Sequence, residues 1–143
     1  MIGNSQLVTR KVFNLAIKYK QKIFLNQVYD LNNLKLSRDR LQVGGAPGLD
    51  GKIKIHISDV RLEQLSKDLK QQKYSPKPIR RIVLPKFNGG VRLLGISSVI
   101  DKIVQGTLVQ LLSYIVDPVF SKYSYGFRPG CGCHDALQFI KLN

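Results

Sequence analysis

Two basic side chains flank a glycine-rich turn in the middle of the chain and could together bind an anion. Lys86 and Arg92 stand on either side of Asn88-Gly89-Gly90, a strong signal for the turn of a β-hairpin. If these three residues form the loop, Phe87 pairs with Val91 and Lys86 pairs with Arg92. Like charges directly opposite each other destabilise a sheet. The pair therefore favours a bound anion such as phosphate, unless a two-residue turn shifts the register.

The same hairpin has an apolar base. The stretches 79–85 and 91–96 are rich in β-branched and aliphatic residues, which is typical of strands. Because side chains alternate between the two faces of a strand, the predicted register places Leu84 beside Leu94 and Ile82 beside Ile96. These four side chains share the face of the two cations.

The whole chain is strongly basic. Its 143 residues contain 23 Lys+Arg against 9 Asp+Glu, which gives a net charge of +14. Such a charge attracts polyanions, so nucleic acid is the leading class of partner, ahead of an acidic membrane surface. An ordinary solvated surface is the alternative. The predicted RNA- or phosphate-binding residues in the densest basic stretch are Lys67, Lys70, Lys73, Lys77, Arg80, Arg81, Lys86 and Arg92.

Other chemistry has little support in the residue pattern. Cys131, Cys133 and His134 stand too close together for one tetrahedral metal site. No spacing among the acids suggests the paired carboxylates that two-metal phosphoryl transfer needs. We therefore expect no metal, no cofactor and no catalytic residue in this chain. No apolar run reaches the roughly 20 residues that cross a bilayer, so we expect no membrane insertion.

The remaining elements follow from periodicity and from turn residues. The first 29 residues contain five bases and no acid, which suits either an organelle-targeting segment or a basic arm on nucleic acid. The pattern predicts one or two helices within 8–29, a break at 44–48, a helix at 59–72 capped by Ser58, a core helix at about 99–115, a loop at 123–130 and a helix from 135.

Five collinear stretches carry a resemblance to a known family. They are Gly45–Gly51 (GAPGLDG), Tyr74–Arg92 (with RRIVLPKFNGGVR), Asp101–Gln105 (DKIVQ), Asp117–Gly130 (with SYGFRPG) and His134–Leu137 (HDAL). In this order they resemble the signatures of the group II intron reverse transcriptase/maturase proteins. The resemblance covers residues 44–140, about two thirds of the chain.

The resemblance implies an α+β fold: the fingers-like part of a right-hand polymerase, with helices packed around a β-hairpin (about 79–96) and a long core helix. Residues 1–43 would then be a basic helical extension, and residues 44–143 a reverse-transcriptase-like fingers and partial palm domain. By the same resemblance, Lys86 and Arg92 match residues that contact the triphosphate of the incoming nucleotide. Arg128 matches an arginine that helps hold template and palm; a structural arginine bound to carbonyl groups is the alternative.

The family's metal-binding Asp and its Tyr-Ala-Asp-Asp loop follow the HDAL motif, and the chain reaches neither. The chain also departs from the family pattern: Leu93 stands where the family has Pro, and Cys131-Gly132-Cys133 stands where it has Arg-Ser-x. Such changes are expected in a protein that is no longer selected for catalysis. We therefore expect a non-catalytic RNA-binding protein in a large ribonucleoprotein, such as an organellar ribosome or an intron-splicing particle.

Its partners would be ribosomal or group II intron RNA, together with other proteins, in the mitochondrial matrix or, alternatively, the bacterial cytoplasm. The rival reading is a fingers piece of an active RNA-directed DNA polymerase that is completed by a separate palm-bearing chain.

Overall fold

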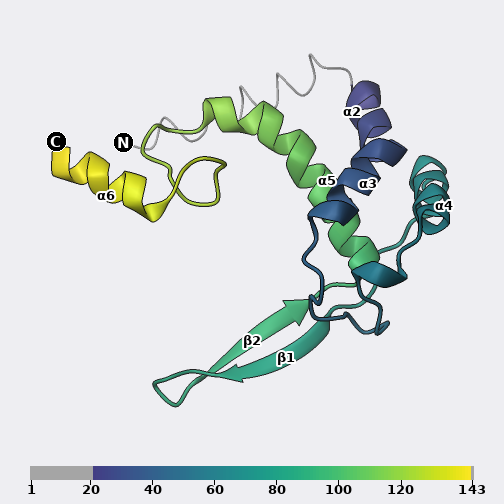
Figure 1. Cartoon of the computed structure of the whole chain (residues 1–143), viewed down its shortest axis with the longest axis horizontal. Helices are drawn as coiled ribbons and strands as arrows, with labels where there is room; N and C mark the ends of the chain where they lie inside the picture. Colours follow the sequence, from purple (N-terminus) through teal and green to yellow (C-terminus); the bar gives the residue numbers. More distant parts are fainter. Residues whose placement is uncertain (1–20, 143) are drawn as a thin grey trace. The chain divides into compact units, whose positions relative to one another are not determined.

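The computed structural model describes residues 21–142, so the predictions for the first 20 residues lie outside it. The described part is α+β, as predicted, with a single two-stranded antiparallel sheet (Figure 1). Its elements are α2 (Gln21–Val28), α3 (Leu31–Arg40), the 3₁₀ turn η1 (Lys54–His56), α4 (Asp59–Lys70), β1 (Arg80–Pro85), β2 (Val91–Ile96), α5 (Val99–Val116), the 3₁₀ turn η2 (Asp117–Val119) and α6 (Cys133–Leu142).

Most predicted elements are confirmed, and one helix was missed. The hairpin, the helix capped by Ser58, the core helix and the helix near the C-terminus all form close to their expected bounds. The missed helix is α3. The Asp30 carboxylate accepts the backbone N–H groups of Asn32 and Asn33 at 3.0 and 3.1 Å, which caps the start of α3. The residues that directly follow the helical stretch predicted within 8–29 therefore begin another helix.

The core lies where α3, α4 and the first half of α5 meet. Leu34 of α3 and Leu62 of α4 are fully buried, and Ile103 of α5 is buried with them. Side chains at spacings of three and four residues on each helix supply this apolar contact. The whole buried cluster consists of Leu34, Ile57, Leu62, Leu65, Val99, Ile100, Ile103 and Val104.

Helices α3 and α5 approach closely at a serine and a glycine. The Ser37 hydroxyl donates to the carbonyl oxygen of Ile103 at 2.8 Å, and both groups are buried. A Cβ atom on Gly106 would lie 2.3 Å from Ser37 Oγ. Glycine is a poor helix former, so its position inside α5 is explained by this contact between the two helices.

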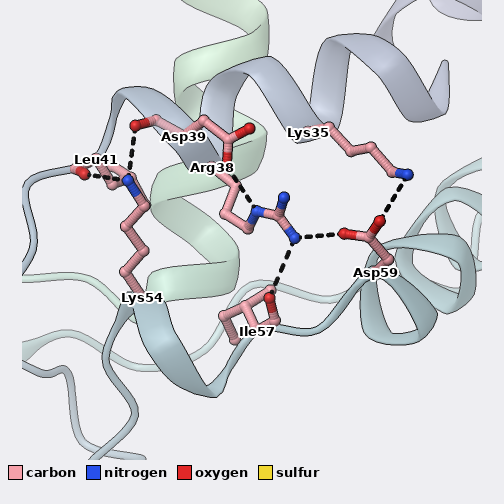
Figure 2. A network of polar contacts seen from close by, with 7 residues as sticks. All are labelled: Lys35, Arg38, Asp39, Leu41, Lys54, Ile57 and Asp59. Atoms are coloured by element: carbon pink, nitrogen blue, oxygen red, sulfur yellow. Dashed lines mark hydrogen bonds and ion pairs between the residues drawn. The ribbon is translucent and has the colours of Figure 1, made fainter.

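An ionic network joins α3 to the start of α4, as Figure 2 shows. Asp59, in the first turn of α4, accepts from Lys35 Nζ at 2.7 Å and from Arg38 Nη1 at 2.5 Å. Arg38 also donates to the Ile57 carbonyl at 3.3 Å. Hydrogen bonds from Lys35 and Arg38 lower the pKa of the Asp59 carboxyl. A carboxylate in the first turn also suits the positive end of the helix dipole.

The chain divides into two compact units, and the boundary falls within α5. One unit runs from Lys22 to Leu111, and the other includes the residues from Leu112 onward. The boundary predicted at residue 43 lies inside the first unit, because α3 supplies Leu34 to the same core as α4 and α5. Residues 22–43 thus belong to this unit.

One helical segment among the described residues, Val99–Val119, meets the length and composition expected of a membrane span, with a mean hydropathy of 1.3. Its first turns are buried against α3 and α4. Two of its three charged residues, Asp101 and Lys102, bond to neighbouring loops, and Asp117 pairs with Arg128. These features are typical of the core helix of a globular unit.

A leucine pair on α3 tests whether this helix belongs to the core. Leu34 is 0% exposed and Leu36 is 46% exposed. We expect Leu34→Ala to lower the free energy of unfolding by about 2–5 kcal/mol, because it leaves a cavity. Leu36→Ala should lower it by less than about 1 kcal/mol. Urea denaturation followed by circular dichroism measures both; equal small effects would place α3 outside the core.

Candidate nucleic-acid interface

The hairpin forms with a register that differs from the predicted one. Leu84 lies opposite Arg92, and Ile82 lies opposite Leu94. The predicted pairing of Lys86 with Arg92 is therefore wrong. The loop consists of Phe87, Asn88 and Gly89, one residue earlier than expected, because Lys86 pairs with Gly90 instead. The backbone N–H of Lys86 donates to the Gly90 carbonyl at 2.7 Å.

The shift changes each partner by two residues and so preserves the faces of the hairpin. Lys86 and Arg92 remain on one face with Ile82 and Leu84, now as diagonal neighbours rather than opposite partners. Diagonal positions are still within reach of long side chains. The two cations can therefore contact neighbouring anionic groups without standing directly against each other.

A buried carboxylate holds the segment that leads into the hairpin. Asp101, in the first turn of α5, is only 3% exposed. It accepts from the Tyr74 hydroxyl, from the Lys77 backbone N–H at 3.2 Å and from the Ser98 hydroxyl at 2.8 Å. Burial and the hydrogen bond to Asp101 raise the pKa of Tyr74 above its ordinary value. Since a buried charge needs such partners, Asp101 and the residues before β1 stabilise each other.

The loop at 44–51, which carries the GAPGLDG signature, packs against the start of α5. A Cβ atom on Gly48 would lie 2.8 Å from both the N and the Cα of Ser98, so only glycine fits there. Lys102 Nζ donates to the Ala46 carbonyl at 2.8 Å, and Arg80 Nη1 donates to the Pro47 carbonyl at 3.4 Å. The signature loop thus contacts both α5 and the base of β1.

An ion pair completes this junction. Lys77 Nζ lies 3.1 Å from Asp50 Oδ2, and the Asp50 side chain is 11% exposed. Burial by itself would raise the pKa of Asp50, but hydrogen bonds from the Lys77 side chain and the Lys52 backbone outweigh it and lower the pKa. Lys77 and Arg80, both predicted to bind phosphate, therefore also position the hairpin.

The structure separates the predicted phosphate-binding residues into groups. Lys67, Lys70 and Lys73 are exposed on the last turns of α4 and just beyond it. Arg80, Arg81, Lys86 and Arg92 are exposed on the hairpin, which projects away from α3 and α4 (Figure 1). Among the described residues, no acid forms an ion pair with any of these seven side chains. Their charge is therefore available to an external anion.

Arg128 lies in the other unit, and its donors are used inside its own loop. The guanidinium donates to both carboxylate oxygens of Asp117 at 2.7 and 3.3 Å. It also donates to the carbonyls of Ser121, Ser124 and Asp117. A guanidinium has five N–H donors, so these bonds occupy all of them. The contacts favour the structural alternative for Arg128, and its role in RNA binding stays a prediction.

Sequence reasoning missed the polar junction below the hairpin. Asp101 and Lys102 entered only as matches to a family motif, and nothing in their spacing indicated contacts with residues 46, 74 and 77. The weak signal was the Ser98–Asp101 spacing, which suits the start of a helix. As for metals, the described residues contain no group of three or more His, Cys, Asp or Glu side chains that could hold an ion.

Relatives of the chain come from fungi and bacteria. It is 42% identical to the "Uncharacterized 91 kDa protein in cob intron" of Schizosaccharomyces pombe, over 99% of this chain and 19% of that protein. It is 39% identical to the "Group II intron-encoded protein LtrA" of Lactococcus lactis subsp. cremoris, over 59% of this chain and 14% of that protein. "Protein YkfC" of Escherichia coli is 38% identical, over 67% of this chain and 26% of its own length.

These relatives confirm the resemblance seen in the motifs. The chain belongs to the group II intron reverse transcriptase/maturase family. It spans about a quarter or less of the length of the curated relatives that it matches. No protein-family model matches it.

Two glycines of the signature loop provide a matched test of the junction. Gly48→Ala should lower the free energy of unfolding by about 1–3 kcal/mol, because its methyl group would meet the Ser98 backbone. At Gly45, by contrast, a Cβ atom would lie 3.5 Å from the Gln42 carbonyl oxygen, an ordinary contact. Gly45→Ala should therefore change stability by less than about 0.5 kcal/mol. Urea denaturation compares the two, and equal effects would contradict the close packing at Ser98.

Proposed function

We propose that this chain binds RNA, chiefly through the hairpin formed by β1 and β2. The observation that carries the proposal is the charge of residues 79–96, which contain Arg80, Arg81, Lys86 and Arg92 and no acid. All four are exposed on an element that projects from the core. Exposed cations gain little from contacts within a protein. They gain much more from releasing counterions on a phosphate backbone.

The described contacts divide the basic residues by use. Lys35, Arg38 and Lys102 bond to carboxylates or carbonyls of the first unit. Those of the hairpin tip and of the end of α4 point to solvent. Solubility alone would not require the exposed cations to gather on the hairpin and at the end of α4. Their grouping there supports a polyanionic partner. The intron-encoded relatives favour RNA over DNA as that partner.

We further propose that the chain acts without catalysis, as a component of a large ribonucleoprotein such as an organellar ribosome or an intron-splicing particle. The matched region resembles the fingers part of the family, in which binding rather than chemistry is concentrated. The cob-intron relative supports an organellar location, most naturally the mitochondrial matrix. The bacterial relatives support the bacterial cytoplasm as the alternative.

The salt dependence of RNA binding tests the hairpin directly. We expect neutralisation of Arg81, Lys86 and Arg92 together, each to Gln, to weaken binding to a labelled 20-nucleotide single-stranded RNA. The slope of log K against log salt should fall by about 2, because each lost contact to single-stranded nucleic acid removes about 0.7. Fluorescence anisotropy between 50 and 250 mM KCl provides the measurement.

A control variant with the same change in net charge makes this result specific. Lys52, Lys122 and Lys141 are exposed outside the two predicted groups, and we replace each by Gln. This triple variant should retain most of the wild-type slope. If both triple variants reduce affinity and slope equally, binding depends on net charge alone, and the hairpin is not the interface.

A split enzyme is the second candidate, and two observations favour it. Lys86 and Arg92 share one face of the hairpin as diagonal neighbours, which suits two contacts to one triphosphate. On the opposite face Val83, Val91 and Leu93 are 57%, 63% and 59% exposed. An apolar surface of this kind could contact a separate chain that bears the palm.

Purification of the native protein at low salt, with crosslinking, separates the two candidates. Under the main proposal we expect ribosomal or intron RNA to be recovered without a polymerase-bearing chain. The double charge reversal Lys86→Glu/Arg92→Glu should then cause only a partial loss of RNA affinity. Recovery of a chain with a Tyr-Ala-Asp-Asp loop, in a complex whose primer extension is abolished by the same reversal, would establish the split enzyme instead.

A further inference from the structure

We propose that Phe87, at the tip of the hairpin, stacks on an unpaired RNA base while Lys86 and Arg92 contact the neighbouring phosphates. This inference rests on the RNA-binding function proposed above. It adds a residue that distinguishes unpaired from paired RNA. Contacts to phosphate alone do not make that distinction.

The side chain of Phe87 is fully exposed and does not pack against the rest of the protein. Its exposed fraction is 113%, so no other side chain covers it. Among the described residues it forms no aromatic pair and no cation–π contact. A large apolar ring in this position contributes nothing to the core, and its packing does not explain why the loop carries phenylalanine.

The loop that presents Phe87 is held by its own hydrogen bonds. The Gly89 N–H donates to the Lys86 carbonyl at 3.2 Å, and the Gly90 N–H donates to Asn88 Oδ1 at 3.3 Å. Gly89 has a φ of +77°, as a three-residue hairpin loop requires at its last position. Since the loop is already ordered, little conformational entropy is lost when a ligand binds the ring.

The charges around Phe87 favour a nucleic acid over an apolar protein surface. Lys86 precedes Phe87, Arg92 lies on the same face as Lys86, and residues 79–96 contain no acid. An exposed aromatic ring among cations is the usual arrangement for single-stranded nucleic acid, because bases stack on the ring while the backbone follows the positive charge. A base inside a duplex does not offer its face, so the ligand must be unpaired.

Three polyanions separate stacking from charge: a labelled 20-nucleotide single-stranded RNA of mixed sequence, a 20-base-pair RNA duplex, and heparin, which has charge but no bases. We expect Phe87→Ala in the full chain to bind the single strand about 5- to 140-fold more weakly, the range measured for lost base stacking. Binding to the duplex and to heparin should change by less than about twofold. Phe87→Trp should retain the wild-type affinity for the single strand.

Phe127→Ala is the matched control, because Phe127 is equally exposed, at 111%, but is followed by an arginine whose donors are bound internally. It should leave all three affinities unchanged. Equal losses on all three ligands with Phe87→Ala, or no loss on the single strand, would overturn the stacking role. A Phe87→Ala variant that keeps RNA binding but loses a co-purifying protein would assign the ring to a protein partner. If the wild type binds none of the three, the RNA-binding proposal itself fails.

Discussion

The arrangement of this unit depends on the hydrogen bonds to one buried carboxylate, that of Asp101. An aspartate that is nearly excluded from water is costly unless every oxygen has donors. Here the donors come from Tyr74, Ser98 and the Lys77 backbone, so the chain before β1 is bound to the start of α5. The first half of the same helix also carries core residues, among them Ile100 and Ile103. One helix end therefore positions the hairpin relative to α3 and α4.

The basic residues serve two purposes that composition alone does not distinguish. Some are used within the fold: Lys35 and Arg38 hold the start of α4, Lys102 binds the signature loop, and Arg128 closes its own loop. The end of α4 and the hairpin keep theirs in solvent, except that Arg80 also donates to the Pro47 carbonyl. The positive charge of the hairpin is therefore not offset locally, because residues 79–96 contain no acid.

Local patterns predicted the elements well wherever one signal was strong. The Asn-Gly-Gly turn, Ser58 before an apolar stripe and the period of the core helix each identify an element by short-range chemistry. Helix α3 was missed because its stripe is short and its cap, Asp30, followed a segment already assigned as helical. The register of the hairpin was wrong by two residues because either three-residue loop satisfies the turn signal. Hydrogen bonds from Lys86 and Gly89 decide between them.

The sequence by itself determined the α+β class, the family, the basic character and the two faces of the hairpin, because these depend on composition, motif order and a period of two. Only the tertiary structure decided which cations face solvent and which are used inside. Such contacts join residues far apart in the chain, as Lys102 and Ala46 or Lys77 and Asp50 do. No local pattern encodes those distances. The exposure of Phe87 is known for the same reason, since only the packed fold shows that nothing covers its ring.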